Sequence, residues 1–182
     1  SLGAMAIPLA KSLGLTVATN GNGENEKRVR ALGADIFIDY KKQSYADVLY
    51  EVDLVLDTLG DRELPTEFKV LKEGGHLVSL RGMPNGRFAR RMGLPWYKRF
   101  LLSLAGRKFD AMAARKKQTY DFIFVHEDGA QLESIASLFP DERPLTASID
   151  ATFTPDQINE ALAKVRAGGS QGKTIVRIGD FQ

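Results

Sequence analysis

Short apolar segments alternate with helix-like segments along almost the whole 182-residue chain. This alternation is typical of a parallel β-sheet, because each return to a parallel strand needs a long crossover connection, usually a helix. The pattern predicts strands at 15–19, 36–40, 52–57, 76–80, 121–125, 147–149 and 174–178. It predicts helices at 4–13, 26–32, 44–50, 63–71, 129–139 and 155–167, with one or two more in a basic segment. Asn25 and Thr154 are the predicted caps, and Gly14, Gly33 and Gly74-Gly75 are the predicted helix stops.

The chain starts with a helix rather than a strand. A doubly wound fold places its first strand at the centre of the sheet, and an empty central position would expose two strand edges. We therefore expect the first strand to lie upstream of Ser1. The predicted fold class is α/β, a doubly wound parallel sheet of the Rossmann type that lacks its first strand and has a basic helical insertion after the fifth. We expect one domain at 1–170, with the insertion at about 83–119, and a C-terminal strand within 171–182.

The overall composition is that of an ordinary globular protein, with 43% hydrophobic and 26% charged residues. No apolar run approaches the roughly 18 residues that a membrane-spanning helix needs, so we expect no membrane partner. The chain has no cysteine, which excludes disulfides and thiolate metal sites and fits a reducing cytoplasm. His76 and His126 stand apart in the sequence, and we predict no metal site from them.

One segment, from Arg87 to Lys117, departs from the even charge distribution. It contains ten basic residues and a single acidic one, Asp110, for a local net charge of +9. Such an excess could serve a non-catalytic anion- or nucleic-acid-binding module, but a solvated helix face is the simpler interpretation, and we do not expect nucleic acid as a partner. An apolar strip in this segment, 94–97 with 100–104, could cover an active site, meet a second copy in a homodimer, or form a solvent-facing lid.

Two glycine-containing stretches suggest a nucleotide site. Ser1-Leu2-Gly3 precedes a helix and matches the last part of a G-x-G-x-x-G fingerprint, in which the helix N-terminus attracts a pyrophosphate. The predicted second strand ends at Thr19-Asn20-Gly21-Asn22, with no acidic residue at its tip. A methyltransferase would use an acid there for the ribose diol, so this end disfavours that alternative, whereas a small polar set admits a 2′-phosphate.

Several motifs together resemble the cofactor domain of the medium-chain dehydrogenases/reductases, and most closely its zinc-independent quinone oxidoreductase branch. The resemblance covers nearly the whole chain. Its motifs are Gly3 before an Ala-rich helix, Arg30 to Asp35, Ile38-Asp39-Tyr40, the run 52–60 (VDLVLDTLG), Leu71 to Val78, and Gly172 to Val176.

The resemblance implies a cofactor site built from strand ends. Ser1, Leu2 and Gly3 would lie under the pyrophosphate, Thr19 and Asn20 beside the adenosine ribose, and Tyr40 near the adenine or its 2′-phosphate. Leu59 and Gly60 would lie where the cofactor crosses the sheet edge, Leu80, Arg81 and Gly82 near the nicotinamide ribose, and Phe122 and Phe124 on the strand beside the nicotinamide. From the residues alone, a structural strand-end tyrosine is the alternative for Tyr40, and alternating aromatics in a strand, such as the two phenylalanines, are more often core residues.

The resemblance also implies the activity, an NAD(P)H-dependent oxidoreductase that transfers hydride to a quinone or to an activated alkene or carbonyl. NADP(H) is the expected cofactor because of Asn20 and Tyr40, with NAD(H) as the alternative because Glu24 would repel a 2′-phosphate. The substrate cleft would be completed by an N-terminal catalytic domain absent from this chain, to which the strand within 171–182 would return. We therefore expect the fragment alone to bind cofactor weakly and to turn over little, and we predict no catalytic residue. The cofactor domain of a zinc-type alcohol dehydrogenase is the alternative within the superfamily.

Overall fold

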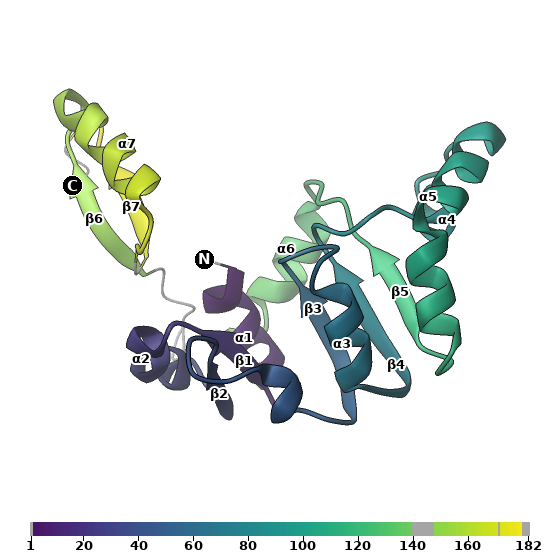
Figure 1. The fold of residues 1–182 in the computed structure, drawn as a ribbon. Helices are drawn as coiled ribbons and strands as arrows, with labels where there is room; N and C mark the ends of the chain where they lie inside the picture. The colour runs from purple at the N-terminus through teal and green to yellow at the C-terminus, as the bar shows by residue number, and fades with distance from the viewer. Residues whose placement is uncertain (1, 140–147, 171, 180–182) are drawn as a thin grey trace. The chain divides into compact units, whose positions relative to one another are not determined.

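The computed structural model describes residues 2–139, 148–170 and 172–179. The chain divides into two compact units, which are described separately (Figure 1). Unit 1 is formed by Ser1–Gln43 with Asp128–Gln182, and unit 2 by Ser44–Glu127. Every strand pair in the described residues is parallel, as the alternation of strands and helices predicts.

The first part of unit 1 contains two parallel strands and their helices. Helix α1 (Leu2–Ser12) leads to β1 (Ala18–Gly21), and α2 (Glu26–Ala31) leads to β2 (Ile36–Asp39). The two strands pair in register from Ala18 opposite Ile36 to Gly21 opposite Asp39. Ile7, Ala34, Phe37 and Ile38 are buried in this unit.

The second part of unit 1 begins with α6 (Gly129–Ala136) and ends in a small βαβ segment. Strand β6 (Ile149–Phe153) and strand β7 (Lys173–Val176) pair in parallel, and α7 (Ile158–Ala167) connects them. A 3-10 turn, Pro155–Gln157, precedes α7. The predicted cap at Thr154 is confirmed, because its backbone N–H donates to Gln157 Oε1 at 3.1 Å in a capping box.

Unit 2 is built on a three-stranded parallel sheet in the order β3-β4-β5 (Figure 1). The strands are β3 (Val52–Asp57), β4 (Leu71–Ser79) and β5 (Thr119–Phe122). Helix α3 (Leu64–Val70) connects the first two, and α4 (Gly86–Arg91) and α5 (Trp96–Ala114) connect the last two. One core cluster joins residues of α3, α5 and the strands: Leu64, Phe68, Leu71, Leu77, Phe109, Ala113 and Tyr120.

Several local predictions from the sequence are wrong. The strand predicted at 121–125 is β5, Thr119–Phe122, so Phe124 lies outside it. The first ladder begins at Ala18 rather than residue 15, because the Asp35 carboxylate accepts the N–H of Val17 at 2.7 Å just before it. The turn after β1 is capped by the Asn22 side chain, not by Asn25. Residues 44–50 form only a 3-10 turn, Tyr45–Asp47. Strand β4 starts at Leu71 and includes Gly74-Gly75, which the sequence predicts as a helix stop. The pairing of β4 with β3 is irregular in this stretch, and Gly74, at φ 75°, accommodates the irregularity.

The basic segment forms the two helices α4 and α5, in agreement with the sequence. The predicted strand at 147–149 begins outside the described residues, and β6 starts at Ile149. None of the helices in the described ranges combines the length and the apolar character required to cross a membrane.

Candidate functional site

The carboxyl ends of β3 and β4 are joined by a buried hydrogen bond. Strand β3 ends at Asp57 and β4 at Ser79, and these side chains are 1% and 0% exposed. The Ser79 hydroxyl donates to Asp57 Oδ2 at 2.5 Å. In parallel α/β sheets this edge is where ligands bind, so the pair lies at the base of the expected binding face of unit 2.

The same two side chains organise the turns that follow the strands. Asp57 Oδ1 accepts the backbone N–H groups of Leu59 at 2.6 Å and Gly60 at 2.9 Å. Ser79 Oγ accepts those of Gly82 at 2.6 Å and Arg81 at 3.2 Å. These four N–H groups donate to the Asp57 and Ser79 side chains. The same four residues can therefore contact a ligand only through their carbonyls and side chains.

Glycine is required in both turns. Gly60 has φ +91°, and a Cβ there would lie 3.0 Å from the carbonyl oxygen of Arg81. A Cβ on Gly82 would lie 2.7 Å from Ser79 Oγ and would overlap the Tyr120 hydroxyl. The two turns therefore pack closely together, and they leave the side chains of Leu59 and Arg81 exposed at the strand ends.

A second buried carboxyl group lies behind Asp57. Glu67 of α3 is 6% exposed, and its Oε2 has no hydrogen-bond partner within the described residues. Burial, together with the nearby charges of Asp57 and Glu63, raises the pKa of Glu67 to about 8. Glu67 is therefore predominantly protonated at neutral pH, which avoids two adjacent buried negative charges.

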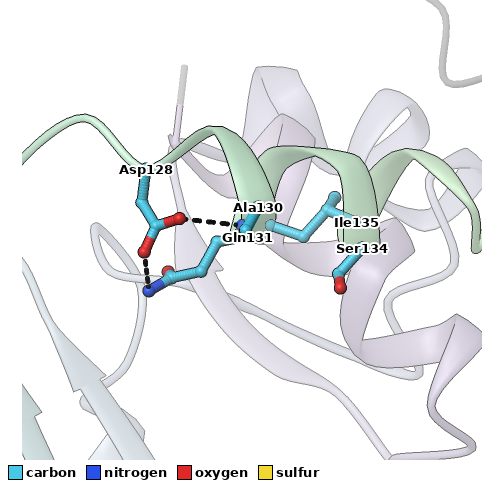
Figure 2. A pocket seen from close by; sticks show the side chains of 5 residues that line it. All are labelled: Asp128, Ala130, Gln131, Ser134 and Ile135. Carbon is cyan, nitrogen blue, oxygen red and sulfur yellow. Dashed lines mark hydrogen bonds between the residues drawn. The ribbon is translucent and has the colours of Figure 1, made fainter.

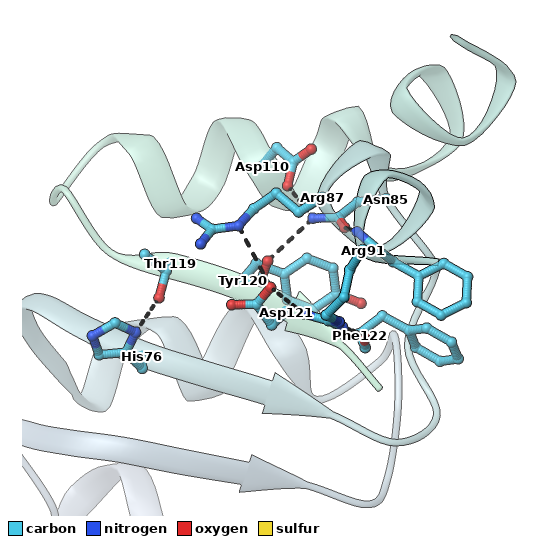
Figure 3. Close-up of polar contacts among 10 residues, drawn as sticks. His76, Asn85, Arg87, Arg91, Asp110, Thr119, Tyr120, Asp121 and Phe122 are labelled. Atoms are coloured by element: carbon cyan, nitrogen blue, oxygen red, sulfur yellow. Dashed lines mark hydrogen bonds and ion pairs between the residues drawn. The ribbon is translucent and has the colours of Figure 1, made fainter. Parts of the chain in front are cut away.

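A polar network links β5 to the helices of the basic segment (Figure 3). The buried Asn85 side chain accepts the N–H of Phe88 at 3.0 Å and donates to Asp110 at 2.7 Å and to the Tyr120 carbonyl at 3.1 Å. The Tyr120 hydroxyl donates to the Met83 carbonyl at 2.9 Å, and burial raises the pKa of this phenol. Asn85 therefore caps α4 while fixing α5 and β5 against it.

The end of β5 places the two predicted phenylalanines differently. Phe122 packs edge-to-face on Phe88, with ring centroids 5.1 Å apart. Phe124 follows the strand and is 64% exposed. An open hollow of about 480 Å³ beside them is lined by Arg87, Arg90, Arg91 and Asp121.

Asp121 partly neutralises this hollow. Its Oδ1 lies 3.5 Å from Arg87 Nε and 3.2 Å from Arg91 Nη1, and Arg91 also donates to the Phe122 carbonyl at 2.5 Å. Two of the three arginines are thus committed to contacts within the protein, which weakens the case for an anion site here.

In unit 1 the predicted residues gather at the ends of β1 and β2 and at the start of α1. Leu2 and Gly3 lie in the first turn of α1, whereas Ser1 lies outside the described residues. Thr19 is half-buried and Asn20 exposed in β1. Tyr40, 59% exposed, directly follows β2 and donates its backbone N–H to the Gly21 carbonyl at 3.2 Å.

Glu24 lies in the turn directly after β1. The Asn22 side-chain amide donates to Glu24 Oε2 at 3.1 Å. A Cβ on Gly23 would overlap the Asp39 carboxylate at the end of β2. Two carboxylates therefore lie near the strand ends of unit 1, and Lys41 and Lys42 follow Tyr40.

A second hollow, of about 360 Å³, lies beside the N-terminus of α6 (Figure 2). Asp128 caps this helix by accepting the Gln131 backbone N–H at 3.0 Å, and the Gln131 side-chain amide at 2.9 Å. The Asp128 carboxylate already accepts hydrogen bonds at this end of the helix. We therefore assign no ligand to this hollow.

Within the described ranges no three His, Cys, Asp or Glu side chains cluster in a way that could hold a metal ion. His76 lies across from Thr119, with Nδ1 2.5 Å from Oγ1 (Figure 3).

The residues predicted from the sequence do not include Asp57, Ser79, Glu67 and Asn85. A signal existed for Asp57, because an acidic residue ends an otherwise apolar strand and Gly60 follows three residues later. Ser79, Glu67 and Asn85 carry no such signal, since only the packing of distant elements buries them.

Comparison with known proteins places these features in context. The family model described as zinc-binding dehydrogenase matches residues 32–176. An NADPH-dependent alkenal/one oxidoreductase of Arabidopsis thaliana, chloroplastic, is 39% identical over 83 residues, which are 44% of this chain and 21% of that protein. The mitochondrial NAD(P)H oxidoreductase RTN4IP1 of Danio rerio is 28% identical over 100% of this chain and 47% of its own length.

Among solved structures, the quinone oxidoreductase from Coxiella burnetii superposes with a TM-score of 0.73 at 22% identity. The match covers 98% of this chain and 50% of that one, and it confirms the Rossmann-type α/β class. The chain spans about half the length of the relatives that it matches from end to end.

Proposed function

The chain belongs to the zinc-binding dehydrogenase family of the medium-chain dehydrogenases/reductases, and on this premise we propose that it is the nicotinamide-nucleotide-binding part of an NAD(P)H-dependent oxidoreductase. In the intact enzyme the acceptor would be a quinone or an activated alkene or carbonyl. The nicotinamide supplies the hydride, and the role of this chain is to position it.

The observation that carries the proposal is the Asp57–Ser79 pair at the carboxyl ends of β3 and β4. It holds two glycine turns in fixed positions on the edge where Rossmann-type sheets bind nucleotides. The turns present an apolar side chain, Leu59, and a cation, Arg81. An apolar surface suits the nicotinamide ring, and a guanidinium can donate hydrogen bonds to the hydroxyls of the nicotinamide ribose. We accordingly propose Leu59, Gly60, Leu80, Arg81 and Gly82 as nicotinamide-side residues, with Phe122 at the end of β5 and Phe124 in the segment that follows it.

Unit 1 would hold the adenosine side of the nucleotide. The N-terminus of α1 at Leu2 and Gly3, with Ser1, would attract the pyrophosphate, because helix N-termini carry unpaired N–H groups and partial positive charge. Thr19 and Asn20 offer a hydroxyl and an amide beside the ribose, and Tyr40 offers an exposed ring for the adenine.

Among the two nicotinamide nucleotides we favour NADP(H). Asn20 is the next-to-last residue of β1, near the strand end where an acid would select a free ribose diol, and Lys41 and Lys42 follow Tyr40. Glu24, held by Asn22, opposes this preference because its charge repels a 2′-phosphate. The name of one relative, NADPH-dependent, supports the same choice, whereas the name of the other, NAD(P)H, covers both nucleotides.

The zinc named in the family description does not fit the described residues, which contain no cluster of ligands for it. We also propose that residues 1–170 bind the nucleotide and that the strand within 171–182 contacts a catalytic domain. In the structure this strand is β7, and it pairs with β6.

Calorimetric titration of the 182-residue chain with NADPH and NADH tests the proposal. We expect both to bind, NADPH more tightly, and Glu24→Gln to raise the NADPH affinity about fivefold, because it removes one solvent-screened repulsion. NADH affinity should be unchanged. Glu133→Gln is the matched control, because it removes an exposed charge on α6. It should change neither the NADPH affinity nor the NADH affinity. Absence of binding by both nucleotides would overturn the proposed function.

A further inference from the structure

The outer side of α5 is apolar. Five large side chains there are exposed: Trp96 by 79%, Phe100 by 61%, Leu101 by 60%, Leu104 by 51% and Tyr97 by 49%. We call these five residues the α5 strip. Trp96, Phe100 and Leu104 follow each other at intervals of four, as do Tyr97 and Leu101, so all five share one side of the helix. An exposed apolar cluster of this kind marks an interaction surface.

The opposite side of α5 is anchored in unit 2. Gly106, Phe109 and Ala113 are buried, and the last two belong to the core cluster. A Cβ on Gly106 would lie 3.2 Å from the Pro84 carbonyl oxygen, so α5 packs closely on the segment before α4. The α5 strip therefore faces away from the core, and the core of unit 2 does not require it.

Cations border the α5 strip. At 100° per residue, Lys98 and Arg99 fall on either side of it, and Arg107 and Lys108 continue the same exposed face beyond Leu104. The only acidic residue of α5 is Asp110, which is bonded to Asn85. The surface thus combines an apolar centre with a positive rim.

We propose that the α5 strip docks on the surface of an anionic phospholipid bilayer. Helices that lie in a bilayer interface combine Trp, Phe and Leu on one side with Lys and Arg at the borders, where the long basic side chains reach the headgroups. The five charged residues within α5 favour a helix lying along the surface over one crossing it. This departs from the sequence-based expectation of no membrane partner, which considered spanning segments alone. It is independent of the proposed nucleotide site.

Two other occupants fit the surface less well. A second copy would bring together two segments of net charge +9, and like charges repel. A single-stranded nucleic acid would stack on Trp96, Tyr97 and Phe100, but Leu101 and Leu104 offer no stacking surface. An anionic bilayer uses the apolar residues and the cations together.

Trp96 is the single tryptophan of the chain, so its fluorescence reports on the α5 strip directly. The full chain is mixed with vesicles of phosphatidylcholine containing phosphatidylglycerol, or with vesicles of phosphatidylcholine alone. We expect co-sedimentation and a blue shift of Trp96 emission with the anionic vesicles, weakened by salt, and at least about tenfold weaker partitioning on the neutral ones.

Matched variants separate the strip from general surface effects. Phe100→Ser with Leu101→Ser should lower partitioning at least about tenfold, because two inserting side chains are lost. Tyr50→Ser with Val125→Ser, at sites 82% and 73% exposed, should leave it unchanged. Lys98→Gln and Lys108→Gln should each lower it about fivefold, and Lys27→Gln and Lys41→Gln should not. Circular dichroism verifies that each variant is folded.

The proposal is overturned if the chain partitions equally onto both vesicle types or onto neither, or if strip and control variants behave alike. A second copy is the occupant instead if vesicles do not bind and sedimentation equilibrium shows a dimer that the Phe100/Leu101 variant loses. A nucleic acid is the occupant instead if vesicles do not bind and oligo-dT binds and shifts Trp96 emission. Either result overturns the proposal.

Discussion

At the carboxyl ends of β3 and β4, two buried side chains receive hydrogen bonds from four backbone N–H groups. Asp57 fixes the turn at Leu59 and Gly60, and Ser79 fixes the turn at Arg81 and Gly82. The bond between the two side chains couples the turns to each other. Because a buried polar group without a partner costs more than a hydrogen bond gains, neither residue can be truncated without loss.

Ser79→Ala therefore has a specific expected cost. It leaves the Gly82 N–H without its 2.6 Å acceptor and Asp57 Oδ2 without its hydroxyl donor, so the free energy of unfolding should fall by about 2–3 kcal/mol. Urea denaturation measures this. Ser134→Ala on the exposed surface of α6 is the matched control and should stay within about 0.5 kcal/mol. Equal stability of the two variants would contradict the role given to Ser79.

The raised pKa of Glu67 has a consequence for stability. Folded protein holds the Glu67 proton up to about pH 8, whereas the unfolded chain releases it near pH 4.5. Unfolding therefore releases a proton in this window, and stability should fall as pH rises from about 4.5 to 8, by at most about 1.4 kcal/mol per pH unit. Below this window the contribution is fully present.

Glu67→Gln should remove this pH dependence, because a neutral amide has no proton to lose. The stability of the variant relative to the parent should therefore increase from pH 5 to pH 8, as measured by urea midpoints. Glu133→Gln, which removes an exposed carboxylate, should show a constant difference. A constant difference for Glu67→Gln as well would mean that its pKa is not raised.

At the scale of the elements, one buried residue links both helices of the basic segment to the sheet. Asn85 caps α4 and reaches both Asp110 of α5 and the Tyr120 carbonyl of β5. Asp128 caps α6 in a similar way, but on an exposed surface and with contacts to Gln131 alone. The two caps share a mechanism and differ in burial.

Asn85→Ala should consequently cost more than Asp128→Ala. We expect a loss of about 3 kcal/mol for the first, which leaves buried partners unpaired, and about 1 kcal/mol for the second, which removes a cap only. Thermal and urea denaturation of both variants check this order. If Asp128→Ala lowered the free energy of unfolding as much as Asn85→Ala, the role of Asn85 as a link between α4, α5 and β5 would be contradicted.

How far the sequence predicts the fold depends on whether a signal is local. Apolar runs such as 52–57 and amphipathic stretches predict β3, α3 and α7 to within a few residues, because each contains its own pattern. Boundaries that depend on a distant partner are missed. The start of β1 is set by the Asp35 side chain, and the start of β4 by an irregular register that Gly74 permits.

The same distinction applies to the site. The glycines and strand-end residues were predicted as a cofactor edge, and Gly60 and Gly82 do form the turns there. Their assignment to the nucleotide stays a prediction. Ser79, Glu67 and Asn85 were not foreseen, because a serine, a helix glutamate and a loop asparagine acquire their roles only through burial against other elements.

At the scale of the whole molecule, the chain has the Rossmann-type architecture of its family and spans about half the length of its full-length relatives. The proposed division of labour follows from this. In this proposal the described units would supply the nucleotide-binding edges, and substrate contacts would come from the remainder of a longer enzyme. The α5 strip adds a surface that this division does not use.

The most direct test of the central claim is hydrogen–deuterium exchange of the chain with and without NADPH. We predict that NADPH protects backbone amides at 18–23, 57–62 and 79–84, the ends of β1, β3 and β4 with their turns, while α7 (Ile158–Ala167) exchanges as before. Protection absent from all three strand ends, or confined to 86–117, would contradict the assignment of this edge to a nicotinamide nucleotide.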